Sequence, residues 1–120
     1  DFLQLLIKDD VDIVSGIYPF KDDKGIAVGK DINGHDLREL SKENDLEEVS
    51  AIGMGFCLIK REVIEKIMQR CGTCFEPMQN LGEDYSFCAR AKGLGFKIYI
   101  DKNVKCKHVG KKEYEVSQWK

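Results

Sequence analysis

The sequence predicts a single α/β domain with few strands, and three patterns support that fold class. Residues 11–18 are rich in β-branched side chains and end at Pro19, which is typical of a buried strand. Residues 60–70 place apolar side chains at helical spacing, and Gly72 follows where a left-handed cap would end the helix. Residues 96–100 alternate in the manner of a half-buried strand.

The remaining segments complete the predicted element order. We expect, in order, a short helix at residues 1–8, a long charged loop at 20–48 that contains a short strand at 25–28, an apolar strand at 50–59, a helix at 83–92, a turn at 101–103 and a strand at 104–109. Loops as long as the one at 20–48 are usually functional or mobile.

Length, composition and charge exclude several classes of protein. The chain has 120 residues, enough for one domain, and its 33% charged and 42% hydrophobic residues exclude collagen-like and plainly disordered chains. Lys and Arg number 19 against 21 Asp and Glu, so nothing indicates a nucleic-acid partner. No apolar run reaches the ~18 residues of a membrane span, and the N-terminal stretch lacks the basic lead of a signal peptide.

The five cysteines favour a reducing compartment. Their number is odd and their spacing scattered, which argues against a secreted disulfide framework, and we expect a cytoplasmic protein. Cys71 and Cys74 form a C-x-x-C pair, but no second ligand pair stands nearby, and the pair follows a helix instead of opening one. An ordinary reduced loop is therefore favoured over a zinc or redox site, which remains an alternative.

Adjacent carboxylates open the predicted helix at 83–92. Glu83 and Asp84 follow Gly82, where free backbone N–H groups and the helix dipole favour negative charge. Helix capping alone would explain such a pair. However, Asp84 falls on the same helix face as Phe87 and Cys88, so it points towards the body of the protein, where a carboxylate needs a partner, a metal or a ligand.

Three further features leave alternatives open. His108 shares a strand face with apolar residues, so it is either a hydrogen-bonded core residue or a ligand, and the lysines around it, Lys111 among them, either meet phosphates or are solvated. The pair Gly53 and Gly55 indicates either tight packing or close approach of a ligand to the backbone. Asp10 and Asp12 spell the D-x-D pattern of metal sites, but the short pattern is weak.

These pieces occur in an order that resembles a known family. The ordered set is Gly53-x-Gly55-Phe56, then Glu83-Asp84 with Arg90, then Gly95 and His108. It is similar to the C-terminal, acceptor-side half of a glycosyltransferase with the GT-A fold, close to the family 2-like inverting enzymes. The resemblance covers nearly the whole chain and implies a partial GT-A fold with a small mixed sheet and two or three helices.

The resemblance implies an enzyme that moves a sugar from a nucleotide-sugar donor to a hydroxyl of a saccharide, lipid or protein acceptor. It implies that Asp84 is the general base and that Glu83 helps to place Asp84 or the acceptor. Gly53, Gly55 and Lys111 would contact substrate. His108 would complete the site of a divalent metal, Mn²⁺ or Mg²⁺, in the intact enzyme.

One departure from the family concerns the metal motif. The family's D-x-D lies just before a segment that resembles residues 1–3, and Asp10 and Asp12 fall after the equivalent helix. We therefore expect residues 1–120 to be the C-terminal portion of a longer catalytic domain that begins before Asp1, and the isolated chain to be inactive. The alternative is a non-catalytic binding or assembly module on the same scaffold, and exposed sheet edges leave self-association open.

Overall fold

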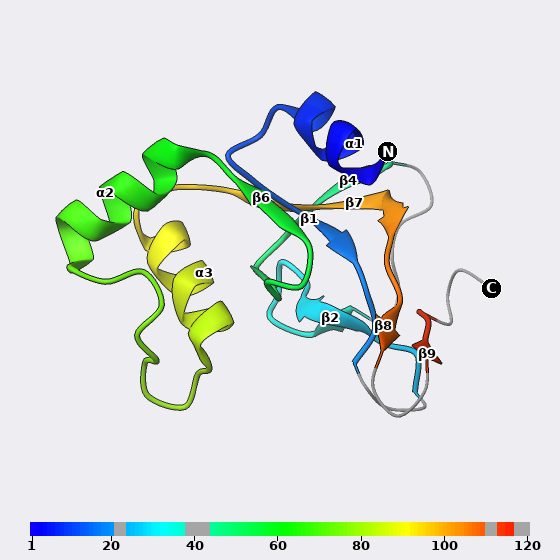
Figure 1. Cartoon of the computed structure of the whole chain (residues 1–120). Helices are drawn as coiled ribbons and strands as arrows, with labels where there is room; N and C mark the ends of the chain where they lie inside the picture. The colour runs from blue at the N-terminus through cyan, green and yellow to red at the C-terminus, as the bar shows by residue number, and fades with distance from the viewer. Residues whose placement is uncertain (21–23, 38–43, 110–112, 117–120) are drawn as a thin grey trace.

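The computed structural model describes residues 1–20, 24–37, 44–109 and 113–116, and for residues 108, 109 and 114 it describes the backbone alone. Within them the chain forms three helices and nine strands (Figure 1). In chain order they are α1 (Phe2–Asp9), β1 (Ile13–Ile17), β2 (Ala27–Lys30), β3 (Asp36–Leu37), β4 (Leu46–Val49), β5 (Ala51–Ile52), β6 (Cys57–Ile59), α2 (Arg61–Cys71), α3 (Glu83–Gly93), β7 (Ile98–Lys105), β8 (His108–Val109) and β9 (Glu113–Tyr114). The predicted α/β class is confirmed.

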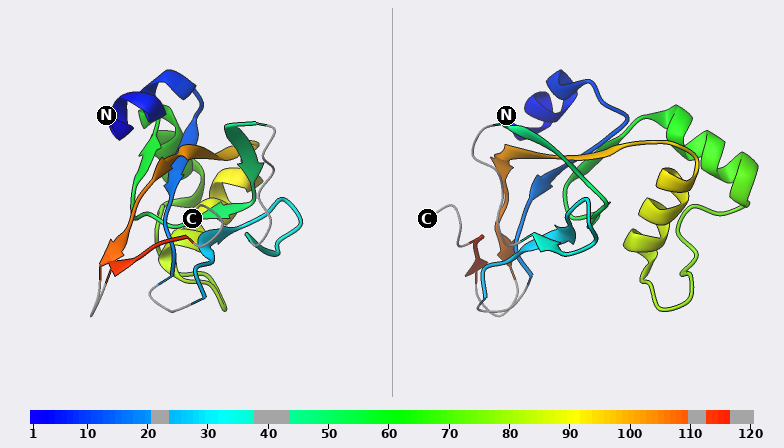
Figure 2. Two further views of the ribbon diagram at one scale, coloured as in Figure 1. Left: turned by 90° about the vertical axis from the view of Figure 1, so that its right-hand side faces the viewer. Right: turned by 180° about the vertical axis from the view of Figure 1, so that it is seen from behind.

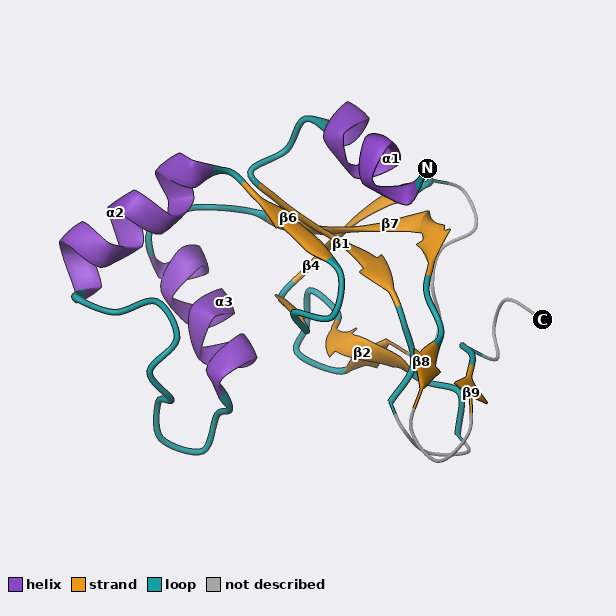
Figure 3. Cartoon of the chain, in the orientation of Figure 1, coloured by secondary structure: helices purple, strands orange, loops and turns teal. Residues whose placement is uncertain are grey.

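The strands form one mixed sheet and two smaller ones. The four-stranded sheet has the order β4-β7-β1-β6, in which β1 is parallel to β7 and the other pairs are antiparallel. A three-stranded sheet has the order β3-β2-β5, and β8 pairs with β9. Figure 3 shows β1 and β7 in the middle of the molecule, with the helices at its periphery. The mixed sheet is small, as the family resemblance implies.

The helices cover the four-stranded sheet on two sides. Leu6 of α1 joins Val14 and Val104 in a small buried cluster on one side of the sheet. On the other side a larger core joins the sheet to α2, α3 and the three-stranded sheet, with Phe87 and Ile98 among its fully buried members. Figure 2 shows α2 and α3 lying side by side, well away from α1. The two clusters account for the burial of both faces of the sheet.

All five residues of β1 are buried because the strand is central and covered on both faces. Successive side chains point to opposite faces, so Ile13 enters the larger core and Val14 the smaller one. A Cβ at Gly16 would lie 2.6 Å from a methyl carbon of Val104, so this position has no room for a side chain.

The predicted helices are confirmed, with their ends close to the predicted residues. Asp1 caps α1, since its carboxylate accepts a hydrogen bond from the Gln4 N–H at 2.9 Å, and Asp10 closes the helix in the left-handed conformation. Gly72, with φ 76°, ends α2 as a left-handed cap. In the described part of the chain, no helix has the length and apolar character needed to cross a bilayer.

The prediction of one long loop at 20–48 is wrong where the structure describes that region. Three strands lie there, β2, β3 and β4, and the predicted strand at 25–28 corresponds to β2. β4 is an edge strand that pairs with β7, from Leu46 opposite Asp101 to Val49 opposite Ile98. Edge strands tolerate charged side chains because one of their sides is open to solvent, which is why the acidic residues of β4 gave no strand signal.

The single strand predicted at 50–59 is also wrong. The segment divides into β5, in the three-stranded sheet, and β6, in the four-stranded sheet, with a turn between them. The apolar run is continuous because both strands are packed, but Gly53 and Gly55 lie in the turn that moves the chain from one sheet to the other.

The turn predicted at 101–103 is wrong as well, because β7 continues through these residues. Asp101 and Lys102 are each only 4% exposed. The Lys102 ammonium lies 3.3 Å from Glu47 Oε1. The turn-forming residues produce an irregularity in the pairing: two steps along β1, from Ser15 to Ile17, match five along β7, from Ile100 to Lys105.

A cluster of carboxyl groups lies where the C-terminal end of α1 meets β7. Asp9, in the last turn of α1, makes a side-chain hydrogen bond with the buried Asp101. Burial, the hydrogen bond to Asp101 and the negative charges of Asp101 and Asp45 raise the pKa of Asp9 to about 7 from its ordinary 3.8. Asp9 therefore keeps its proton in the folded protein below neutral pH.

Replacing Asp9 by asparagine is expected to stabilise the protein above pH 7 by ~1–2 kcal/mol and to have less effect at pH 5. The unfolded chain loses the Asp9 proton near pH 3.8, whereas the folded chain keeps it to about pH 7, so the wild-type protein loses stability as the pH rises through this window. The amide of Asp9→Asn donates to Asp101 at every pH.

Urea unfolding of the wild type and Asp9→Asn at pH 5, 7 and 8 measures this difference. Glu76→Gln, which removes an exposed carboxylate elsewhere, is the matched control. A stabilisation by Asp9→Asn that is the same at pH 5 and pH 8 would show that the pKa of Asp9 is not raised in the folded protein.

Candidate functional site

The predicted acidic pair lies at the N-terminal end of α3. Gly82 precedes the helix in an extended conformation, and Glu83 and Asp84 occupy its first turn. Glu83 is exposed, whereas Asp84 is half-buried, and its Oδ2 atom accepts a hydrogen bond from the Met54 N–H at 3.1 Å. The inward direction expected for Asp84 is confirmed, and its partner is the backbone of the turn between β5 and β6.

A pocket of about 340 Å³ opens beside these carboxylates. Its lining comes from two separate parts of the chain, one at β2 and just before it and one at the start of α3; the residues are Phe20, Val28, Lys30, Gly82, Glu83, Asp84 and Tyr85. Figure 3 shows the N-terminal end of α3 facing β2. The fold therefore places Glu83 and Asp84 at an open hollow that has both apolar and charged walls.

The sequence did not indicate the residues from the β2 side of this pocket. Phe20 and Val28 lie in the segment interpreted as a loop, and Lys30 ends β2, where its ammonium lies 2.7 Å from Asp36 Oδ1. No local pattern could have found them, because only the pairing of β2 with β5 brings this strand to α3.

The two glycines of the β5–β6 turn pack against Tyr18. A Cβ at Gly53 would lie 2.0 Å from the Tyr18 hydroxyl oxygen, and one at Gly55 would lie 2.6 Å from the Tyr18 Cζ. The Gly55 N–H donates to the same hydroxyl oxygen at 2.9 Å. Of the two interpretations that the sequence left open, the structure supports tight packing, since a tyrosine ring occupies the space next to both glycines.

The surroundings of Asp84 are partly desolvated, and the phenol and thiol groups beside it have raised pKa values for this reason. Burial raises the pKa of Tyr18, and the negative charge of Asp84 adds to the effect. Burial and Asp84 also raise the pKa of Cys57, and burial raises that of Cys88 to about 11. These phenol and thiol groups therefore remain neutral at physiological pH.

The structure does not join His108 or Lys111 to this pocket. The backbone of His108 begins β8, where it pairs with Tyr114 of β9, and the position of its side chain is not described. Lys111 lies outside the described residues. Among the residues whose side chains are described, no group of three His, Cys, Asp or Glu residues is arranged to hold a metal ion.

The C-x-x-C pair shows no sign of a site in the described structure. Cys71 is exposed and Cys74 is buried, and both are free thiols. Burial raises the pKa of Cys74, which keeps its thiol protonated. Arg90 donates a hydrogen bond to the Cys74 carbonyl oxygen at 3.0 Å, so this loop is fixed to α3.

Asp10 and Asp12 line a different hollow, of about 290 Å³, at the start of β1. The Asp10 carboxylate lies 3.0 Å from the Lys60 ammonium, and Gly95, Lys97 and Tyr99 complete the lining with Val11. Several side chains thus converge on this pair, but the nearest charge is a lysine, and among the described residues the pair belongs to no group arranged to hold a metal ion.

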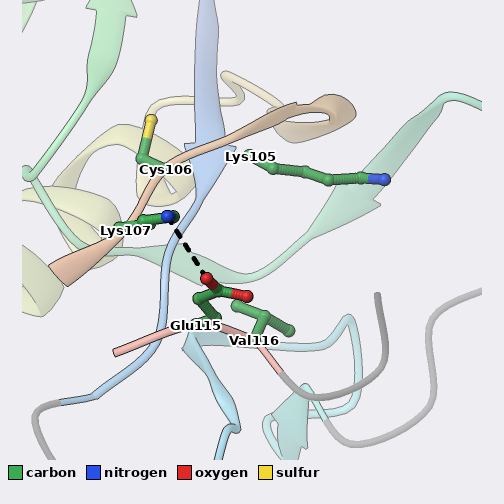
Figure 4. Close-up of a pocket in the computed structure, with 5 residues that line it drawn as sticks. All are labelled: Lys105, Cys106, Lys107, Glu115 and Val116. Atoms are coloured by element: carbon green, nitrogen blue, oxygen red, sulfur yellow. Dashed lines mark ion pairs between the residues drawn. The ribbon is translucent and has the colours of Figure 1, made fainter. Parts of the chain in front are cut away.

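A third hollow, of about 120 Å³, lies near the C-terminal strands (Figure 4). It is lined by Lys105, Cys106, Lys107, Glu115 and Val116. Lys107 forms ion pairs with both Glu113 and Glu115. Figure 4 shows the Lys105 side chain extending away from Lys107, so the two ammonium groups do not converge on a common ligand position.

Comparison with known proteins supports the fold. No protein-family model matches the chain, and no curated protein matches it. The solved crystal structure of A197 from STIV is similar, with a TM-score of 0.59 and 27% sequence identity. The match covers 90% of this chain and 48% of A197, so the chain spans about half the length of that protein.

Replacing Gly55 by alanine is expected to destabilise the protein by ~1–3 kcal/mol, because the new methyl group would overlap the Tyr18 ring. Gly93→Ala is the matched control, since no atom lies within 4 Å of a Cβ there, and it should be neutral or slightly stabilising. Thermal unfolding of both variants tests the packing. A Gly55→Ala protein as stable as the wild type would mean that the glycine is not required by Tyr18.

Proposed function

We propose that this chain is the acceptor-side part of a GT-A-like glycosyltransferase catalytic domain and that Asp84 is its general base. One observation carries the proposal: the half-buried Asp84 carboxylate is fixed by the Met54 N–H at a helix N-terminus, and it lines an open pocket of about 340 Å³. The order of sequence motifs supports the assignment to this family. The likeness to A197 supports the fold of this chain.

The geometry suits removal of a proton from an acceptor hydroxyl. Oδ2 of Asp84 is held by Met54, which fixes the orientation of the carboxylate, and the N-terminal end of α3 stabilises its negative charge. A sugar hydroxyl is a weak nucleophile, so a positioned base increases its reactivity. In the proposed step, the acceptor oxygen forms a bond to the anomeric carbon as Asp84 takes its proton. The bond from that carbon to the nucleotide diphosphate breaks, and its electron pair leaves with the phosphate.

Glu83 is proposed to position the acceptor. Its carboxylate is exposed at the rim of the same pocket, next to Asp84 in the first turn of α3. Carboxylate oxygens accept hydrogen bonds from sugar hydroxyls, so Glu83 is suited to bind a hydroxyl near the reacting one. The contribution of Gly53 and Gly55 is indirect, since they admit the Tyr18 ring and so place the turn that holds Asp84.

The residues described here do not by themselves fit a divalent metal. No group of three ligand residues with described side chains is arranged for one. In the proposed enzyme, His108 would be one ligand of Mn²⁺ or Mg²⁺, which would stabilise the charge of the leaving diphosphate. Lys111 would contact the substrate.

Asp84→Asn in the full-length protein is expected to lower kcat for sugar transfer by ~10²- to 10⁴-fold, because the amide cannot accept the hydroxyl proton. The variant should keep its fold, since the amide oxygen can still accept from Met54. Transfer from a panel of sugar nucleotides, assayed with Mn²⁺, measures the effect. Glu62→Gln, in the first turn of α2, is the matched control and should leave transfer unchanged. Near-normal turnover of Asp84→Asn would exclude Asp84 as the base.

His108→Ala is expected to raise the Mn²⁺ concentration needed for half-maximal transfer, because one metal ligand is lost. Metal titrations of the wild type and the variant in the full-length protein measure this shift. Titration curves that overlay would assign His108 a structural role alone.

A further inference from the structure

The pocket at Asp84 has a second wall that the family resemblance did not supply. Phe20, one-third exposed, and Val28 provide apolar surface opposite the carboxylates. Tyr85 adds an aromatic ring that is half-buried, and its hydroxyl makes a hydrogen bond with the backbone of Gly29 in β2. Burial raises the pKa of Tyr85, so the hydroxyl stays neutral. This wall is therefore apolar and aromatic.

The charges around the pocket are predominantly negative. Lys30 is the cation among the lining residues, and its ammonium lies 2.7 Å from Asp36 Oδ1, so its charge is largely balanced. Glu83 and Asp84 then leave an excess of two negative charges at the opening. A negatively charged ligand in this partly desolvated pocket would lie close to both carboxylates and be repelled by them, so the pocket disfavours an anionic ligand.

The size of the pocket limits the ligand further. About 340 Å³ is at the lower end of the range for small-molecule sites, which is roughly 300–1,000 Å³. A ring-sized ligand fits this volume better than an extended chain. Carboxylates on one side suit hydroxyl groups, and the aromatic wall on the other suits the apolar C–H face of a ring.

We propose that the pocket binds one uncharged sugar residue and that Phe20 and the Lys30–Asp36 pair determine which acceptors are accepted. The sugar lies with an apolar face against Phe20 and its hydroxyls towards Glu83 and Asp84. Sugars that carry a carboxylate or phosphate are excluded by the negative opening. The inference rests on the proposed function, because it names the class of acceptor for the same site.

The test measures binding of small glycosides to the full-length protein by ligand-observed NMR. The probes are the methyl glycosides of glucose, galactose and mannose, together with the methyl glycoside of glucuronic acid, which adds a carboxylate to the glucose ring. We expect the wild type to bind at least one neutral glycoside and to bind the glucuronide at least ~10-fold more weakly than the glucoside.

Phe20→Ala is expected to weaken binding of the neutral glycosides at least ~10-fold. Ile32→Ala is the matched control, since Ile32 is an exposed apolar residue of the same segment that does not line the pocket. If Phe20→Ala fails to fold, Phe20→Leu keeps the apolar volume without the ring face and should still weaken binding.

Asp36→Asn leaves the Lys30 charge unbalanced. The ratio of the glucoside affinity to the glucuronide affinity should therefore fall at least ~3-fold.

Three results would overturn the inference: no binding of any neutral glycoside, equal binding of the glucuronide, or equal effects of Phe20→Ala and Ile32→Ala. The proposed function is judged separately by transfer assays. Selective binding of neutral glycosides without transfer from any donor would reject the proposed glycosyltransferase activity and support an uncharged sugar as the ligand. If the protein transfers sugar and neither Phe20→Ala nor Asp36→Asn changes that transfer, the proposed acceptor site is rejected and the glycosyltransferase activity stands.

Discussion

The parallel pairing of β1 with β7 at the centre of the four-stranded sheet is the constraint on which the rest of the structure depends. Both faces of β1 are covered, by α1 on one side and by the larger core on the other, so every residue of the strand is buried. The close approach of Val104 to Gly16 shows how tightly the two strands are matched. Because β1 leads directly to Tyr18, the central strand also fixes the ring against which the β5–β6 turn packs.

From that ring, contacts lead in a few steps to the candidate site. The Tyr18 hydroxyl accepts from the Gly55 N–H, the neighbouring Met54 N–H donates to Asp84, and Asp84 begins α3. The carboxylate is thus positioned by a turn whose conformation depends on two glycines. Positioning by backbone atoms is rigid, since it does not rely on the rotamer of another side chain. This rigidity suits the proposed role of Asp84 as a general base.

The charged residues show how tertiary structure changes the meaning of a sequence pattern. Asp101, Lys102 and Asn103 have the composition of a turn, yet they continue β7, and Glu47 of β4 provides a partner for the buried lysine. Asp9 and Asp101 are far apart in the chain, yet their side chains form a hydrogen bond in the folded state. A local sequence pattern predicts that charged residues are exposed to solvent. It contains no information about residues from distant segments that pair with them and allow them to be buried.

The sequence by itself determined the fold class, the three helices with their ends, the central strand and the inward direction of Asp84. Each of these follows from local periodicity, from caps such as Gly72, or from the position of a residue on a helix face. Only the tertiary structure decided that residues 50–59 form two strands, that Gly53 and Gly55 make room for Tyr18, and that Phe20, Val28 and Lys30 face the acidic pair. These outcomes depend on the pairing of β2 with β5 and on the packing of α3 against β5, which join residues more than 20 positions apart and leave no periodic signal in either segment.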